Sequence, residues 1–301
     1  MVDIAASVLM KLKNKARVSG ISYQQCLQLF LQEEFLRRLS GSPYSKNFVL
    51  KGGLFIYTLT NFESRATVDV DFLMHGLSND LAHMDDIIAE ILSVNTGNDF
   101  ITFKAANTVQ IAPQRKYHGV STQIIGCIKN VRVPFNVDIG VGDVIIPHAE
   151  LREIKTQLEG FARPEILTYS LESTIAEKFD AIIQRFELTG RMKDFYDIYY
   201  LSKTFDFDGL KLQTAMQKTL QNRGTQYERD SLSHVLALVK NEDMQIRWRH
   251  FLKTLGNPEI EFSEIIRGIQ EFLSPIWEAI FAGTQILYHW NAETFSWELQ
   301  N

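Results

Sequence analysis

Apolar residues recur at helical spacing along the first forty residues of the chain. An interval of four separates Ile4, Val8 and Leu12, and a similar pattern runs through residues 27–36. Such intervals place apolar side chains on one face of a helix. Because a Ser-Gly pair at 19–20 interrupts the pattern and Gly41-Ser42-Pro43 ends it, we predict two helices.

The next hundred residues mix strand and helix patterns. FVLKGGLFIYTL, which starts at Phe48, predicts a short strand, a glycine turn and a helix, and TVDVDFLM at 67–74 alternates as a strand does. An amphipathic helix is expected at 82–94, and three β-rich segments follow near residues 100–111, 121–128 and 131–141. Helical patterns return after about residue 165, and the aromatic tail YHWNAETFSWELQ predicts a small terminal hairpin.

This layout predicts an α+β protein with an α/β core. We expect an N-terminal helical segment over residues 1–43, a core with a mixed sheet over 44–160, and a mainly helical C-terminal domain over 161–301. The boundary near 160 is soft, because Gly160 and Pro164 are the chain breakers there.

Composition narrows the classes of function. The chain has 301 residues, of which 45% are hydrophobic and 22% charged, which is typical of a globular protein. A formal net charge of -5 argues against a protein that coats long nucleic acids, so a nucleic-acid contact would have to be local. No apolar run approaches the ~20 residues of a membrane helix. The two cysteines lack the spacing of a zinc or disulfide framework. From both observations together we expect a cytoplasmic protein without a membrane partner.

The strand at 67–74 carries the first candidate chemistry. Its alternation points Val68, Val70 and Phe72 to one face, and Asp69 and Asp71 to the other. Two carboxylates on one face repel each other unless a cation lies between them, and Mg2+ prefers oxygen ligands. An acidic, solvent-facing strand is the commoner explanation of a DxD motif taken alone.

Several neighbouring features change that balance. Gly52-Gly53 allows backbone N–H groups to approach a phosphate at the start of a helix, although a plain tight turn explains the pair as well. Arg65 precedes the two carboxylates. Asp138, in PFNVDIGVGD, is a candidate third metal ligand or else an aspartate at a strand end.

The helical half supplies further charged candidates. Lys178 lies within or beside the apolar stripe of the helix predicted near 171–188, where a lysine either extends to solvent or serves a polar site. In RMKDFYDIYYL, Asp194 and Asp197 are three residues apart and share a helix side, next to Lys193. Helix capping and surface ion pairs are the structural alternatives for these two aspartates.

In their order and combination, VLKGGLFIYTL, RATVDVDF, AEKFDAI and RMKDFYDIYYL resemble the nucleotidyltransferase toxins of the AbiEii/AbiGii type, over about residues 48–201. The resemblance implies a polymerase-β-like nucleotidyltransferase fold whose helical domain completes the active-site cleft. It implies transfer of a nucleoside monophosphate from a nucleoside triphosphate, with Mg2+ or Mn2+ as cofactor. The characterised relatives modify the 3′ end of tRNA, and a cognate antitoxin encoded nearby opposes them.

The resemblance also assigns roles by position. It implies metal binding by two carboxylates and a possible third, phosphate binding by the glycine turn and two cations, and catalysis by a lysine and two further carboxylates. The residues are Asp69, Asp71 and Asp138 for metal, Gly52, Gly53, Arg65 and Lys193 for phosphates, and Lys178, Asp194 and Asp197, with Asp69 and Asp71, for catalysis. The last two aspartates would orient the lysine or act as a base.

One departure and several alternatives stay open. The superfamily pattern is glycine-serine, whereas this chain has Gly52-Gly53, so the phosphate turn lacks a hydroxyl, as is common in the toxin branch that the chain resembles. The acceptor could instead be a protein hydroxyl or a small molecule, or the fold could be a catalytically silent binding module. A tRNA acceptor requires a basic patch, and two clusters qualify unless they are ordinary solvated helix faces: Lys11, Lys13, Lys15 and Arg17, and Arg247, Arg249, His250 and Lys253.

Overall fold

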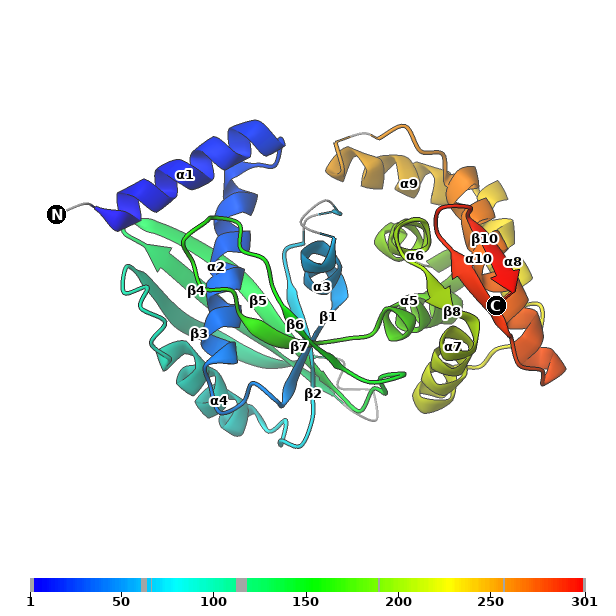
Figure 1. Ribbon diagram of the computed structural model, residues 1–301, viewed down its shortest axis with the longest axis horizontal. Coiled ribbons are helices and arrows are strands. Elements are labelled where there is room, and N and C mark those ends of the chain that lie inside the picture. Colours follow the sequence, from blue (N-terminus) through cyan, green and yellow to red (C-terminus); the bar gives the residue numbers. More distant parts are fainter. Residues whose placement is uncertain are drawn as a thin grey trace. The chain divides into compact units, whose positions relative to one another are not determined.

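The computed structural model describes residues 3–60, 64–65, 67–111, 118–188, 190–256 and 258–299. The chain divides into two compact units (Figure 1). Each unit has its own hydrophobic core. The first unit comprises Met1–Gly142 and Ala149–Tyr169, and the second comprises Asp143–His148 and Ser170–Asn301. No helix among the described residues combines the length and apolar character needed to cross a bilayer.

A mixed seven-stranded sheet forms the centre of the first unit, in the order β3-β4-β5-β2-β1-β7-β6. Its strands are β1 (Phe48–Lys51), β2 (Val70–Met74), β3 (Ile101–Ile111), β4 (Gly119–Ile128), β5 (Val131–Val141), β6 (Glu150–Glu153) and β7 (Glu165–Thr168). The pairs β2–β5 and β1–β7 are parallel, and the other neighbours are antiparallel. The predicted mixed core is confirmed, whereas the two short strands β7 and β6 at one end of the sheet were not predicted.

Four helices accompany this sheet: α1 (Ile4–Ser19), α2 (Tyr23–Ser40), α3 (Gly52–Leu59) and α4 (Leu81–Ser93). The predicted break between the first two is confirmed. Gly20 ends α1 in the left-handed conformation, with φ 76°, which glycine adopts without steric cost. Ser22 then begins α2 with a capping box to Gln25.

Helix α2 lies across one face of the sheet (Figure 1). Its side chains are buried on nearly all sides. Phe35 packs against Phe72 of β2 and Phe135 of β5, with ring centroids 6.1 and 6.4 Å apart. These contacts join the middle of the helix to the two parallel strands at the centre of the sheet. The helix therefore fixes which face of β2 and β5 is the core face.

Ion pairs within α2 satisfy its buried charges. Arg37 contacts Glu33 at 2.9 Å and Glu34 at 2.7 Å, and Arg38 contacts Glu34 at 3.3 Å. All three pairs join residues three or four apart, which are neighbours on a helix surface. Burial raises the pKa of Glu33 to about 7, and the nearby Arg37 only partly opposes this shift.

The second unit is mainly helical and ends in a hairpin. Its elements are α5 (Leu171–Arg185), α6 (Met192–Thr204), β8 (Phe207–Asp208), α7 (Gly209–Arg223), α8 (Ser231–Ala237), α9 (Glu242–Thr254), α10 (Phe262–Ala282), β9 (Tyr288–Asn291) and β10 (Ser296–Leu299). The predicted hairpin is confirmed as β9–β10. Its Trp290 is fully buried and donates from Nε1 to the carbonyl of Ser202 at 2.6 Å, so the hairpin belongs to the core of this unit.

Arg223 holds the segment Asp143–His148 in the second unit. Its guanidinium contacts Asp143 at 3.0 Å, Glu177 at 2.9 Å and Asp180 at 3.0 Å. Burial alone would lower the pKa of Arg223, but the carboxylates, Glu177 foremost, raise it above its usual range. The cluster is therefore a structural anchor in which one buried cation joins α5, α7 and the segment.

Packing of α2 on the sheet predicts a sharp difference between two strand glycines. A Cβ at Gly126 would lie 2.8 Å from Leu31 Cδ1, whereas a Cβ at Gly140 would meet nothing closer than 3.8 Å. We expect Gly126→Ala to lower the free energy of unfolding by about 1–3 kcal/mol. Gly140→Ala should change it by less than about 0.5 kcal/mol. Urea unfolding followed by circular dichroism measures both, and equal effects would contradict this packing.

Candidate active site

A row of polar side chains crosses the sheet of the first unit. The parallel register of β2 and β5 places Asp71 directly opposite Asp138. The antiparallel register of β1 and β2 places Lys51 opposite Asp71, and that of β4 and β5 places Ser121 opposite Asp138. Residues that face each other across neighbouring strands point to the same side of the sheet. Ser121, Asp138, Asp71 and Lys51 therefore form one continuous row on four strands.

The opposite face of the same strands is hydrophobic. Val70, Phe72 and Val137 have no exposed surface, and Ile139 is 1% exposed. Because successive side chains alternate between the faces of a strand, burial of these four residues forces both aspartates to the other side. Ser121 Oγ donates a hydrogen bond to Asp138 Oδ1 at 2.5 Å, which fixes one oxygen of that carboxylate.

Asp69 differs from its prediction in one respect. The sequence pattern starts the strand at residue 67, but β2 begins at Val70, so Asp69 immediately precedes it. Val68 is 57% exposed, so the predicted apolar alternation does not extend to it. The amide groups of Gln28 and Gln32 on α2 donate to the Val68 carbonyl at 2.5 and 2.7 Å. These two bonds hold the backbone immediately before Asp69.

The glycine turn lies directly against Asp71. Gly52 has φ +68°, and a Cβ there would be 2.1 Å from Asp71 Oδ2. Only a residue without a side chain fits between this turn and the carboxylate. Helix α3 begins at the same residue, and its N-cap residue Lys51 makes no side-chain capping hydrogen bond. The N-terminus of a helix favours an anion, such as a phosphate.

Two more side chains lie at the second glycine of the turn. A Cβ on Gly53 would be 2.7 Å from Thr67 Oγ1 and 3.5 Å from Arg65 Nη1. The predicted residues Gly52, Gly53, Arg65, Asp71 and Asp138 are therefore brought together on one side of the sheet. Thr67 joins them without having been predicted.

The donor set on this face suits a hard divalent cation. Among the described residues, no group of three or more His, Cys, Asp or Glu side chains converges as a metal cage. A cation such as Mg2+ is commonly held by one or two carboxylates, with water and substrate phosphates as its remaining ligands. Asp71 and Asp138 lie side by side and offer only oxygen atoms. The residues present thus fit a site that is completed by a phosphate-bearing substrate.

A second cluster of predicted residues lies in the helical unit. Lys178 on α5 is 8% exposed, and its Nζ lies 3.3 Å from Asp194 Oδ1 and 2.6 Å from Asp197 Oδ2 on α6. Arg191 Nε contacts Asp194 Oδ2 at 2.5 Å. The alternative that Lys178 extends into solvent is wrong, because two buried carboxylates hold its ammonium. Lys193, by contrast, is exposed at the start of α6.

Comparison with known protein families shows to which family the chain belongs. The sequence model of the family described as "Nucleotidyl transferase AbiEii toxin, Type IV TA system" matches residues 34–275. The chain belongs to this family. A search of curated protein sequences found no significant match.

One solved structure supports the fold, and a second is reported beside it. MenT4, a nucleotidyltransferase toxin from Mycobacterium tuberculosis H37Rv, is similar with a TM-score of 0.55 and 15% identity, over 92% of this chain and 99% of that chain. JHP933 from Helicobacter pylori gives a TM-score of 0.49 and 15% identity, over 87% and 95%. The MenT4 likeness confirms the predicted nucleotidyltransferase fold.

Membership of the AbiEii family establishes the general activity. The chain is a nucleotidyltransferase and a toxin of a toxin–antitoxin system. The family implies a nucleotide substrate and an antitoxin partner, and nucleotidyltransferases of this kind generally use divalent metal ions. The glycine turn and the paired carboxylates therefore lie in a nucleotidyltransferase.

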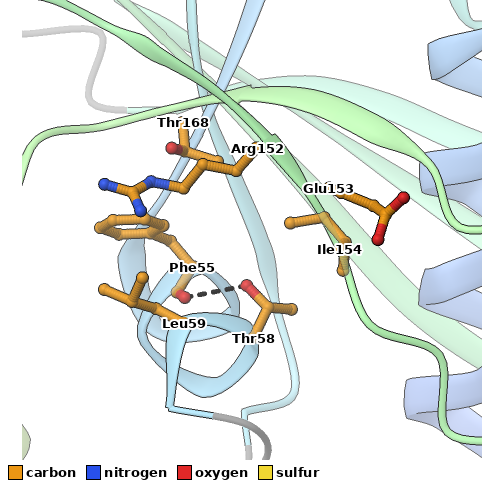
Figure 2. Close-up of a pocket in the computed structure, with 7 residues that line it drawn as sticks. All are labelled: Phe55, Thr58, Leu59, Arg152, Glu153, Ile154 and Thr168. Carbon is orange, nitrogen blue, oxygen red and sulfur yellow. Dashed lines mark hydrogen bonds between the residues drawn. The ribbon is translucent and has the colours of Figure 1, made fainter.

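The first unit also contains a pocket of about 290 Å³ beside α3 (Figure 2). It is lined by Phe55, Thr58, Leu59, Arg152, Glu153, Ile154 and Thr168. Figure 2 shows the Arg152 guanidinium next to the Phe55 ring. None of the predicted site residues lines this pocket, so it does not define the nucleotide site.

Sequence reasoning missed Lys51, Ser121, Thr67 and the two glutamines of α2. Alternation along β1 and β4 was the available signal for Lys51 and Ser121, because each occupies the same strand face as an aspartate. That signal needs the register between strands distant in sequence, which no local pattern supplies. No sequence signal places Thr67 against Gly53 or Gln28 against Val68.

The contact between Gly52 and Asp71 predicts a substitution effect that separates the site from stability. Gly52 and Gly76 have nearly equal φ values of +68° and +70°, but a Cβ on Gly76 would meet only Asn47 Nδ2, at 3.6 Å. Alanine at either position costs roughly 1–2 kcal/mol of backbone strain. We expect Gly52→Ala to displace Asp71 and abolish toxicity, whereas Gly76→Ala stays toxic.

Growth of cells that express each variant, with thermal unfolding of the purified proteins, measures these outcomes. A toxic Gly52→Ala variant would show that the close approach of the turn to Asp71 has no role in activity.

Proposed function

We propose that this toxin transfers a nucleoside monophosphate from a nucleoside triphosphate to the 3′ end of tRNA, with Mg2+ as cofactor and Mn2+ as a substitute. One observation carries the proposal: the register of β2 and β5 sets Asp71 beside Asp138, and the glycine turn touches Asp71. Carboxylates that hold a cation and a turn that accepts phosphate are thereby adjacent, as nucleotidyl transfer requires.

The proposed reaction is an in-line displacement at the α-phosphate. The acceptor hydroxyl oxygen forms a bond to phosphorus, the bond to the β-phosphate oxygen breaks, and pyrophosphate leaves while the hydroxyl proton passes to a base. A divalent ion held by Asp69, Asp71 and Asp138 would neutralise charge on the phosphates. The backbone of Gly52–Gly53 and the Arg65 guanidinium bind and orient the triphosphate.

Lys178 is proposed to stabilise phosphate charge, with Asp194 and Asp197 as its orienting partners. Both carboxylates contact Nζ. These contacts support a role for Asp194 and Asp197 in orienting the lysine, rather than a role for Asp197 as the base that takes the proton. Removal of Lys178 would leave these buried carboxylates without their ammonium partner, which typically costs about 3–5 kcal/mol of stability. Lys193 is exposed at the start of α6 and is proposed to contact phosphate.

The tRNA acceptor is supported by a mixed aromatic and basic surface on α6 and α9. Tyr196 and Tyr200 stack with ring centroids 5.9 Å apart and an interplanar angle of 20°, and Phe251 of α9 meets Tyr196 at 5.7 Å. We call this the α6–α9 surface; the same two helices carry the basic residues Lys193, Arg247, Arg249, His250 and Lys253. Single-stranded RNA ends are recognised by aromatic rings that stack on bases, together with cations that attract the backbone.

The other predicted basic cluster loses one member. Lys15 on α1 donates from Nζ to the Gln157 carbonyl at 3.1 Å, and burial lowers its pKa. It therefore serves packing within the first unit, which leaves Lys11, Lys13 and Arg17 exposed on that helix. This difference favours the α6–α9 surface as the site of RNA contact.

The acceptor is tested with purified tRNA, purified protein and each of the four α-labelled nucleoside triphosphates. We expect Mg2+-dependent labelling of tRNA by the wild-type protein and none by Asp71→Ala, because that variant loses one of the paired carboxylates. Asp85→Ala, which removes an exposed aspartate of α4, is the matched control and should label as well as wild type. Label on protein or on a small molecule would identify another acceptor, and a fully active Asp71→Ala variant would refute the proposed site.

The α6–α9 surface predicts a change in RNA affinity that leaves nucleotide affinity intact. Loss of one stacked base costs roughly 1–3 kcal/mol, so Tyr200→Ala should raise KM for tRNA about fivefold to a hundredfold. Tyr200→Phe keeps the ring and should behave like wild type. Steady-state kinetics with varied tRNA and varied nucleotide separates the two constants, and an unchanged KM for tRNA in Tyr196→Ala and Tyr200→Ala would exclude this surface.

A further inference from the structure

The hydroxyl group of Thr67 occupies an unusual place at the glycine turn. Thr67 precedes β2 and is half-buried. Among the described residues, its Oγ1 has one hydrogen-bond contact, 3.5 Å to the Asp69 carbonyl, at the limit of hydrogen bonding. The described part of the chain therefore makes little use of the donor capacity of this hydroxyl.

Thr67 fills the space that a side chain on Gly53 would occupy. A Cβ built on Gly53 would lie 2.7 Å from Thr67 Oγ1 and 2.9 Å from Thr67 Cβ. Real Cβ atoms do not approach other atoms so closely, so a side chain at 53 and the threonine at 67 exclude each other. Residue 53 must therefore be glycine, because Thr67 occupies the space beside it. Thr67 also places a hydroxyl next to the glycine turn, whose own two residues carry none.

Three groups that favour anions meet at this point. The first is the N-terminus of α3, which begins at Gly52 and Gly53. The second is Arg65, whose Nη1 is 3.5 Å from the position of a Gly53 Cβ. The third is the Thr67 hydroxyl, 2.7 Å from the same position. A phosphate oxygen bound there can accept hydrogen bonds from a backbone N–H, a guanidinium and a hydroxyl.

We propose that Thr67 is a phosphate-binding residue of the nucleotide site, and that its hydroxyl donates a hydrogen bond to a triphosphate oxygen of the nucleotide donor. This inference rests on the nucleoside triphosphate donor of the proposed function. Thr67 binds the substrate directly, and it takes the place of a hydroxyl on residue 53. No proton is transferred and no bond is broken at Thr67.

The first test removes the hydroxyl and keeps the shape of the side chain. Isothermal titration calorimetry with ATP, GTP, CTP and UTP in MgCl2 measures nucleotide affinity without any acceptor. A hydrogen bond to a charged group contributes enough that Thr67→Val should weaken binding on the order of tenfold to a hundredfold. Thr67→Ser keeps the hydroxyl and should bind within about threefold of wild type, and thermal unfolding of both variants controls for stability.

The second test moves the hydroxyl from residue 67 to residue 53. Gly53→Ser alone should damage binding, because its Cβ collides with Thr67. Thr67→Gly alone should also weaken binding, because the hydroxyl is lost. In the double variant Gly53→Ser with Thr67→Gly, the collision is gone and the hydroxyl is restored at the turn. We expect it to bind more tightly than either single variant, which is a coupling that a double-mutant cycle measures.

The outcomes separate this inference from the proposed function. If wild type binds nucleotide and folded Thr67→Val binds equally well, Thr67 is not a phosphate ligand, while the donor assignment stands. If the losses of binding free energy in the two single variants simply add in the double variant, a hydroxyl at residue 53 does not replace that of Thr67, and this part of the inference is refuted. If wild type binds none of the four nucleotides, the proposed donor is wrong and the role of Thr67 is refuted with it.

Discussion

The parallel pairing of β2 with β5 is the constraint on which the proposed active site depends. It brings Asp71 and Asp138 side by side, although a helix and two long strands separate them along the chain. A slip of one residue in either strand would turn its aspartate into the hydrophobic core and expose Phe72 or Ile139. Burial of the apolar face is therefore what keeps two like charges adjacent on the other face, where a cation can offset their repulsion.

Helix α2 connects this core to the chemistry of the site. Its aromatic contacts with β2 and β5 define the buried face, and its glutamines at 28 and 32 hold the Val68 carbonyl in front of Asp69. Its charged residues satisfy one another, so a helix with many polar side chains can stay buried. The same helix thus stabilises the sheet and fixes the backbone from which the first carboxylate projects.

Local sequence patterns predicted the helices and strands and the face on which a side chain lies, but not which distant residues contact one another. Alternation predicted that Asp69 and Asp71 leave the core face, and a spacing of three placed Asp194 and Asp197 on one side of α6. That Asp71 faces Lys51 and Asp138, or that both helix aspartates hold Lys178, follows from strand register and from the packing of α5 on α6. Such long-range pairings leave no periodic trace in the sequence. Thr67 was missed for the same reason, because its contact with Gly53 exists only in three dimensions.

Direct measurement of metal binding tests most closely whether the paired carboxylates are the cation site. Mn2+ titrations of the purified protein, followed by electron paramagnetic resonance, report the free ion without any acceptor or nucleotide. We predict that wild type binds Mn2+, and that Asp71→Asn and Asp138→Asn each weaken binding by roughly tenfold or more. The exposed-site variant Asp85→Asn should bind as wild type does. Unchanged Mn2+ affinity in a folded Asp138→Asn protein would contradict the pairing of Asp71 and Asp138 as the metal site.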